Sequence, residues 1–295
     1  MKLQKYSYIL IFCNIFLIVF FLILNIPAVE KEIIHDSLIL KNEIDSIAEI
    51  IINIPDNDLK AGFNIVHLIK KNDGFVLNAA GREYKTKKEI IDRFLFLLSE
   101  KQIFLFVTDD VKQSSSFGFN ADKTAQIKIF KDDKSLIGEF VFGKQNTLGS
   151  GRYIRAGGRT KIFLMPDIIS PFLTLHSDFW INLQRYENFF SGYRVQALQK
   201  DNVYIIRSAE NEKDFFNLEL FLKQFSCVDI FPALPLTSSH TESFILFLDN
   251  KEKIKIELTP IENGDYILSD SVSENAYIIS GYTKRRILEL LGKLS

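Results

Sequence analysis

Residues 65–77 read IVHLIKKNDGFVL, and residues 195–206 read VQALQKDNVYII. Each stretch has a run of mostly apolar residues, a polar turn that contains Asp and Asn, and a second apolar run with β-branched and aromatic residues. This pattern is typical of a β-hairpin, because β-branched residues favour strands and Asn, Asp and Gly favour tight turns. The two stretches therefore predict two similar hairpins in different parts of the chain.

The segments that follow the two hairpins repeat the same order of features, which predicts two copies of one structural unit. An amphipathic helix comes first, then a strand, a hairpin with a charged turn, a pair of strands and a closing helix. We therefore expect an α+β protein with two tandem, repeat-related domains and mainly antiparallel sheets, the first over residues 47–184 and the second over residues 193–295. The expected elements are 87–100, 103–107, 125–142, 153–164 and 166–175 in the first unit, and 212–225, 228–231, 244–258, 266–279 and 284–294 in the second.

The N-terminal part has a different character. Residues 8–26 carry no charge, and 15 of these 19 residues are Ile, Leu, Phe or Val. A helix of this length spans about 28 Å, close to the ~30 Å hydrocarbon core of a bilayer. The run predicts one transmembrane signal-anchor helix, preceded by a short cytoplasmic tail at residues 1–7 and followed by a helical stalk at residues 27–46.

Two other interpretations of this run are weaker. A cleaved signal peptide would end in a small-residue cleavage site, and only the poor candidate NIPAV at residues 25–29 follows the run. A lipoprotein signal would place small residues before Cys13, where the bulky Phe12 stands, and its apolar stretch would end there.

The charges beside the run favour one orientation. Lys2 and Lys5 precede it, whereas Glu30, Lys31 and Glu32 follow it. Because positive charges tend to stay on the cytoplasmic side, we expect the protein in the inner (cytoplasmic) membrane, with the bulk of the chain on the extracytoplasmic side.

Composition argues against several classes of function. With 36 Lys and Arg against 37 Asp and Glu, the chain lacks the basic excess that attracts nucleic acid. Cys13 and Cys227 form no plausible disulfide, and the four histidines are scattered singly. We therefore expect no nucleic-acid partner, no metal and no cofactor.

Two features remain as candidate contact sites. Arg152, Arg155, Arg159 and Lys161 crowd around a Gly-Gly turn and could bind an anionic group or an acidic partner, although a solvated hairpin surface explains them as well. Trp180, the single tryptophan, lies near the expected domain joint and could anchor an interface or pack in a core. Residues 143–152 contain three glycines but lack the Gly-Lys-Ser/Thr ending of a phosphate loop, so we interpret them as a loop between strands.

The chain also resembles a known family. The order of modules after the N-terminal run, and above all Gly143, residues 153–154, residues 162–164 and residues 171–172, is similar to the bacterial domain of unknown function 4340 family. The resemblance implies a membrane-anchored protein associated with ABC-type transporters of the gliding-motility auxiliary kind. It implies no catalytic residues.

Three functional hypotheses follow. The first is a non-enzymatic, membrane-anchored extracytoplasmic accessory or scaffold component, with the membrane and ABC transporter subunits as partners. The second is an envelope ligand-binding module that uses the groove between the two repeats. The third and weakest is an envelope hydrolase, because no serine or carboxylate motif of that chemistry is evident.

Overall fold

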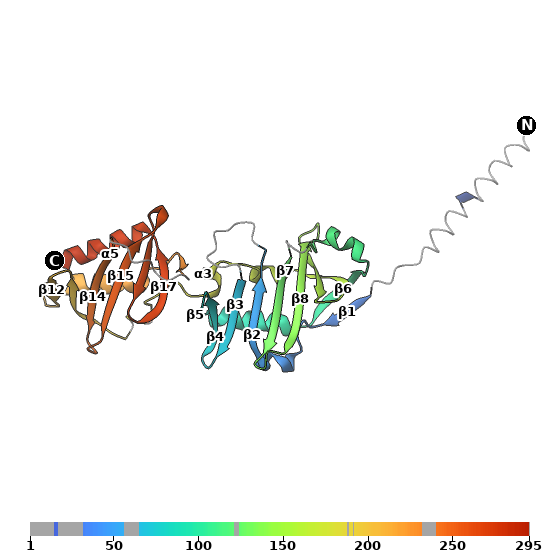
Figure 1. Cartoon of the computed structure of the whole chain (residues 1–295), viewed down its shortest axis with the longest axis horizontal. Helices are drawn as coiled ribbons and strands as arrows, with labels where there is room; N and C mark the ends of the chain where they lie inside the picture. Colours follow the sequence, from blue (N-terminus) through green and yellow to red (C-terminus); the bar gives the residue numbers. More distant parts are fainter. Residues whose placement is uncertain are drawn as a thin grey trace, which may run out of the picture.

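The computed structural model describes residues 15–16, 32–55, 65–120, 124–187, 189–190, 192–231 and 240–294. The described chain has an α+β fold with two mostly antiparallel sheets that lie end to end (Figure 1). We call the part built on the first sheet the first module and the part built on the second sheet the second module.

The first sheet has ten strands in the order β1-β6-β10-β9-β8-β7-β2-β3-β4-β5. Every neighbouring pair in it is antiparallel. Buried and partly exposed residues alternate over most of β2, β3 and β7, so one face of the sheet is buried and the other is in contact with water. The strands are β1 (Ile33–Asp36), β2 (Ile47–Asn53), β3 (Ile65–Lys71), β4 (Gly74–Ala79), β5 (Arg82–Lys85), β6 (Gln102–Thr108), β7 (Ala125–Lys131), β8 (Leu136–Gln145), β9 (Gly151–Ala156) and β10 (Ile162–Pro166).

One amphipathic helix, α2 (Lys88–Ser99), covers the buried face of the first sheet. Its buried residues Ile91, Phe94 and Leu98 recur every three or four positions and so lie on one side of the helix. Phe94 stacks on Phe172, with ring centroids 4.9 Å apart. This helix confirms the one predicted over residues 87–100.

The remaining helical segments of the first module are short: η1 (Lys41–Ser46), η2 (Val111–Phe117), η3 (Ser170–Phe172) and α3 (Ser177–Trp180). The prediction of a closing helix over residues 166–175 is therefore wrong. Pro171 lies in this segment and cannot donate a backbone hydrogen bond, which disfavours a longer helix there.

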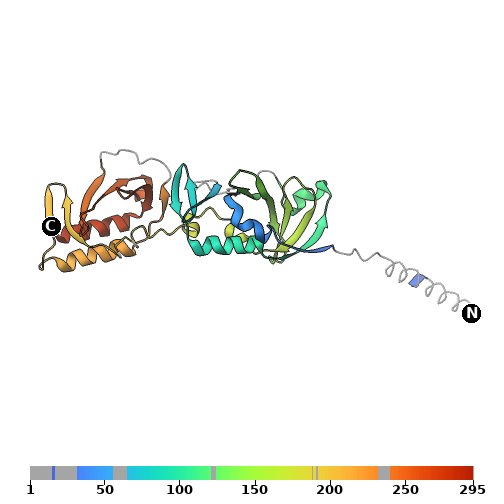
Figure 2. The same cartoon turned by 90° about the horizontal axis from the view of Figure 1, so that it is seen from below.

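The second sheet has seven strands in the order β12-β11-β14-β15-β16-β17-β13, all antiparallel to their neighbours. Two helices, α4 (Glu212–Gln224) and α5 (Gly281–Leu294), pack against each other and confirm the two predicted there. Figure 2 shows α2 in cyan and α4 in orange along the same side of the molecule. The strands are β11 (Val195–Lys200), β12 (Val203–Ile206), β13 (Asp229–Phe231), β14 (Glu242–Leu248), β15 (Lys253–Pro260), β16 (Tyr266–Asp270) and β17 (Ser273–Ile279).

The two sheets share a core of seven strands. The order β3-β2-β7-β8-β9-β10-β6 in the first sheet corresponds to β12-β11-β14-β15-β16-β17-β13 in the second, in chain order and in strand direction. The counterpart of the β11–β12 hairpin is thus β2–β3. The sequence analysis instead matched the β11–β12 hairpin with the β3–β4 hairpin. This match is wrong, because β4 and β5 are additional strands at the edge of the first sheet and have no counterpart in the second.

The N-terminal edge of the first sheet is β1, which pairs with β6 from Ile33 opposite Leu105 to Asp36 opposite Gln102. The prediction of a helical stalk over residues 27–46 is wrong for this part, because residues 33–36 are a strand of the first sheet and residues 41–46 form η1. The spanning helix predicted over residues 8–26 lies outside the described residues, apart from Ile15 and Phe16, which are helical. Within the described ranges, no helix is long and apolar enough to cross a bilayer.

The outer face of the first sheet carries a small charged cluster. Glu49 of β2 accepts a hydrogen bond from Lys134 at 2.6 Å and lies 2.5 Å from the Nε2 atom of His67. The hydrogen bond from Lys134, and then that with His67, lower the pKa of the Glu49 carboxyl below its ordinary value of 4.5, against the opposing effect of partial burial.

We expect Glu49→Gln to lower the free energy of unfolding at neutral pH by up to about 1 kcal/mol. A carboxyl whose pKa is lowered by folding stabilises the protein above its unfolded pKa and loses that contribution as the pH falls through the folded value. The stability difference between Glu49→Gln and the unaltered protein should therefore be constant above pH 4.5 and shrink below it. Urea unfolding at a series of pH values measures this, and a difference that grows on acidification would contradict it.

Candidate functional site at the junction of the modules

The junction begins where the chain leaves the first module. Ile181 forms an isolated bridge with Thr86, and the backbone N–H of Lys87 donates to the carbonyl oxygen of Trp180 at 2.8 Å. These contacts fasten the segment after α3 beside β5, the edge strand of the first sheet. The residues that follow then reach the second module within a few positions.

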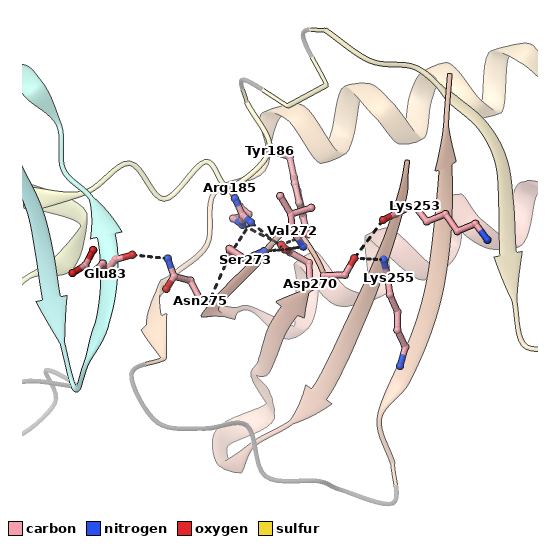
Figure 3. A network of polar contacts seen from close by, with 10 residues as sticks. Glu83, Arg185, Tyr186, Lys253, Lys255, Asp270, Val272, Ser273 and Asn275 are labelled. Carbon is pink, nitrogen blue, oxygen red and sulfur yellow. Dashed lines mark hydrogen bonds and ion pairs between the residues drawn. The ribbon is translucent and has the colours of Figure 1, made fainter. Parts of the chain in front are cut away.

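A buried ion pair holds this segment to the second module. Arg185 donates from Nε to Oδ2 of Asp270 and from Nη2 to Oδ1, both at 3.0 Å, and Nη2 also donates to the Ser273 hydroxyl at 2.9 Å (Figure 3). The Asp270 side chain is 0% exposed and that of Arg185 is 16% exposed. The carboxylate also accepts hydrogen bonds from the backbone N–H groups of Val272 and Ser273. A bidentate, charge-assisted pair of this kind fixes both distance and orientation.

Aromatic rings enclose the ion pair. The guanidinium carbon of Arg185 lies 5.5 Å from the ring centroid of Tyr186 and 5.7 Å from that of Tyr277. The Tyr186 hydroxyl donates to Oδ2 of Asp270 at 2.9 Å. Burial opposes the charge of Arg185, but the carboxylate of Asp270 keeps its pKa above the ordinary value. The network thus consists of a charged pair in an aromatic box.

The neutral groups around the pair stay protonated at physiological pH. Burial raises the pKa of the Cys227 thiol to about 12 and that of Tyr277 to about 12. Burial, and next the charge of Asp270, raise the pKa of Tyr186 well above its usual value. Because a thiol reacts as the thiolate, Cys227 is an inert core residue. The residues of this cluster therefore hold the linking segment in place, and neither Cys227 nor the two tyrosines are activated as nucleophiles.

Direct contacts also join the modules. The Tyr84 hydroxyl of β5 donates toward the carbonyl oxygens of Ala276 and Phe231, at 3.3 and 3.4 Å. The Asn275 side chain donates to the carbonyl oxygen of Glu83 at 2.8 Å. The rings of Tyr84 and Tyr277 meet edge to face at 5.7 Å. One apolar cluster consequently runs from the core of the first module into that of the second.

A cleft of about 1370 Å³ opens beside this junction. Both modules line it, the first through the β3–β4 turn and Glu83, the second through Ser273, Asn275 and Tyr277. Its charges are balanced, and Lys71 and Glu83 pair within it at 2.7 Å. Its basic and acidic lining residues are Lys70, Lys71, Lys85, Lys131 and Arg185, and Asp45, Asp73, Glu83, Asp132 and Asp133.

The four basic residues predicted as a contact site do not act as one group. Arg152 is an internal clamp, since it pairs with Asp167 at 3.1 Å and donates to the Ser170 hydroxyl at 2.6 Å and to the Gly143 carbonyl oxygen at 2.8 Å. Its guanidinium is therefore occupied within the chain. Arg155, Arg159 and Lys161 instead line a separate small pocket near β1.

Trp180 does not lie on a surface. Its side chain is 0% exposed and packs against Phe94 and Phe172, with its indole N–H donating to the carbonyl oxygen of Thr174 at 3.0 Å. Of the two roles that the sequence left open for Trp180, the structure thus shows packing in the core of the first module. Its helix does touch the second module, through a hydrogen bond from Ser177 to Asp229.

Comparison with known proteins finds one relative of note. An uncharacterized protein of Treponema pallidum (strain Nichols) is 27% identical to this chain over 248 residues, which is 84% of this chain and 77% of that protein. No family model and no solved structure matches the chain. The aligned 248 residues therefore include most of the residues that form the two modules.

Sequence reasoning missed the residues that form the junction. Arg185 and Asp270 are separated by 85 positions, and neither stands in a recognisable motif. Their role becomes visible only when the second sheet places the end of β16 against the linking segment. Throughout the described ranges, no three His, Cys, Asp or Glu side chains are grouped so as to hold a metal ion.

Proposed function

We propose that this protein is a non-enzymatic, membrane-anchored scaffold or accessory component of an ABC-type transport system. The hydrophobic run at residues 8–26 would hold it in the inner membrane, with both modules on the extracytoplasmic side. The transporter association comes from the resemblance of the chain to the domain of unknown function 4340 family. The matching strand order of the two sheets supports an origin of the modules by duplication of one unit.

The observation that carries this proposal is the buried Arg185–Asp270–Tyr186 network. Domains joined by a simple linker move independently, whereas a large apolar contact holds them in one orientation. Here a largely buried ion pair and a continuous apolar cluster link the two modules. A body of this kind can hold partner surfaces at a set distance from the membrane, which is what a scaffold does.

Copurification tests the proposal. The full chain, extracted from its own membranes in mild detergent, should bring down the ATP-binding subunit and the permease of one transporter, identified by mass spectrometry. Protease added outside intact spheroplasts should degrade both modules. A monodisperse protein with no transporter subunit, or modules cleaved only after lysis, would refute the assignment.

The cleft supports a second candidate, an envelope ligand-binding module. Its volume of about 1370 Å³ exceeds that of most small-molecule sites, and its mixed charges suit a polar ligand. Native mass spectrometry of the full chain from its own membranes should then show a bound mass that Lys85→Ala reduces. The exposed Lys253, on the second sheet, offers a control, since Lys253→Ala should leave that mass in place. Protein without any bound mass would argue against this candidate.

A further inference from the structure

A second pocket, of about 300 Å³, is lined by residues of β1, β6, β8, β9 and β10. Strand β1 lies at the end of the first sheet farthest from the second module (Figure 1). The floor of the pocket is apolar and crosses the strands at that end. Ile34 of β1 stands opposite Phe104 of β6, and Phe163 of β10 stands opposite Ile154 of β9. The rings of Phe104 and Phe163 meet edge to face at 6.4 Å. The floor is thus preformed by strand pairing and needs no ligand to assemble.

The lining of this pocket is positively charged. Arg155, Arg159 and Lys161 face a single acidic lining residue, Asp36, among the residues that the structure describes. Arg155 lies over the ring of Phe119 at 5.0 Å and Lys161 over the ring of Phe106 at 5.6 Å. The ring contact of Lys161 holds this cation near the pocket, because Phe106 stands opposite Phe163 and shares a sheet face with the floor. The Arg155 side chain lies on the opposite face of the sheet, because Arg155 is paired with Val141 and follows Ile154 of the floor in β9.

Lys161 has one acidic neighbour outside the pocket. Its Nζ atom is 3.8 Å from the carboxylate of Glu32, and both side chains are about half exposed. A long, solvated pair of this kind is weak and can exchange for another anion. Among the described residues that line the pocket, Arg159 and Lys161 thus supply two cations against the single carboxylate of Asp36.

The position of the pocket in the chain points to its ligand. The hydrophobic run ends at Ile26, and β1 starts at Ile33, just after Glu32. The five residues between Ile26 and Glu32 can span at most about 20 Å when fully extended. If residues 8–26 cross a bilayer, the covalent chain alone keeps the β1 edge close to the lipid headgroups.

We propose that this pocket binds the headgroup region of an anionic phospholipid of the membrane in which the protein is anchored. This inference rests on the membrane anchoring of the proposed function. Arg159 and Lys161 would contact the phosphate, since a basic residue near an anionic surface is attracted to it. The apolar floor would take the first part of an acyl chain. The first module would thereby lie against the membrane at its β1 end, and the second module would point away from it.

A lipid titration tests the proposal. The full chain in an uncharged detergent is titrated with dihexanoyl phosphatidylglycerol, with dihexanoyl phosphatidylcholine and with inorganic phosphate, and binding is measured by native mass spectrometry. We expect phosphatidylglycerol to bind at least about tenfold more tightly than phosphatidylcholine, because only the former has net negative charge. Inorganic phosphate should compete poorly, because it cannot occupy the apolar floor.

A pair of charge-matched variants gives the control. Arg159→Glu combined with Lys161→Glu should abolish the preference for phosphatidylglycerol. Lys253→Glu combined with Lys255→Glu changes two exposed lysines of β15 and should leave the preference intact. All four positions are exposed, so circular dichroism should show both variants folded.

The outcomes separate this inference from the proposed function. Equal binding of the two lipids, or an unchanged preference in Arg159→Glu with Lys161→Glu, overturns the lipid site. Competition by inorganic phosphate at the same concentration as the lipid overturns the choice of a lipid and assigns a free anion site. Release of the full chain from its membranes by an alkaline wash refutes the anchoring instead, whatever the titration shows.

Discussion

Asp270→Ala is expected to lower the free energy of unfolding by about 3–5 kcal/mol, because it leaves Arg185 buried without its counter-ion. The loss also removes the acceptor for the Tyr186 hydroxyl and for two backbone N–H groups at the end of β16. Buried donors left without acceptors add to the cost, since their hydration in the unfolded state is not replaced. Both effects act at the junction, so the variant should also loosen the connection between the modules.

Urea unfolding followed by far-ultraviolet circular dichroism measures this change in the full chain. Glu274→Ala is the matched control, because Glu274 is an exposed carboxylate only four positions from Asp270. Its effect should stay within about 0.5 kcal/mol.

A double-mutant cycle separates the ion pair from general damage to the fold. Arg185→Met combined with Asp270→Ala should cost less than the sum of the two single changes, because the double variant leaves no unpaired buried charge. Additive losses would show that the two residues do not act as a unit, and the scaffold proposal would lose its main support.

Trp180→Ala is expected to destabilise the first module by about 3–5 kcal/mol, the range for truncating a large aromatic residue in a core. The side chain is fully buried and touches the rings of Phe94, Phe172 and Phe179. Its removal leaves a cavity at the place where α2 and α3 meet. The aromatic neighbours cannot fill that cavity without leaving their stacked and edge-to-face contacts with one another.

Calorimetry of the full chain is the suitable measurement, because Trp180 is the only tryptophan and the variant has no tryptophan fluorescence. Phe96→Ala serves as the control, since Phe96 lies on α2 but is 59% exposed. A loss from Trp180→Ala no larger than that from Phe96→Ala would contradict the packing that the structure shows.

In the protein with Trp180 intact, tryptophan fluorescence reports on the first module alone. The Asp270→Ala change lies in the second module, and the junction couples the two. Fluorescence and circular dichroism should therefore report one transition in the unaltered protein, and two separate transitions in Asp270→Ala, where the junction is loosened.

Local patterns in the sequence determined most of the secondary structure. The helices at residues 88–99, 212–224 and 281–294, the hairpins and the α+β class were predictable, because apolar spacing and turn residues act over a few neighbouring positions. The order of elements also predicted two similar units. Each of these features depends on residues close together in the chain.

Tertiary structure alone decided which strands pair and what lies at the junction. The sequence of residues 33–36 predicts part of a helical stalk, but in the structure these residues pair with β6 as an edge strand. The sequence of β4 resembles that of β12, but the strand order shows that β4 has no counterpart in the second sheet. Arg185 and Asp270 are 85 positions apart in the sequence and come into contact only in the folded protein. The physical reason is that edge pairing and burial depend on partners distant in sequence, and no local pattern encodes where those partners will stand.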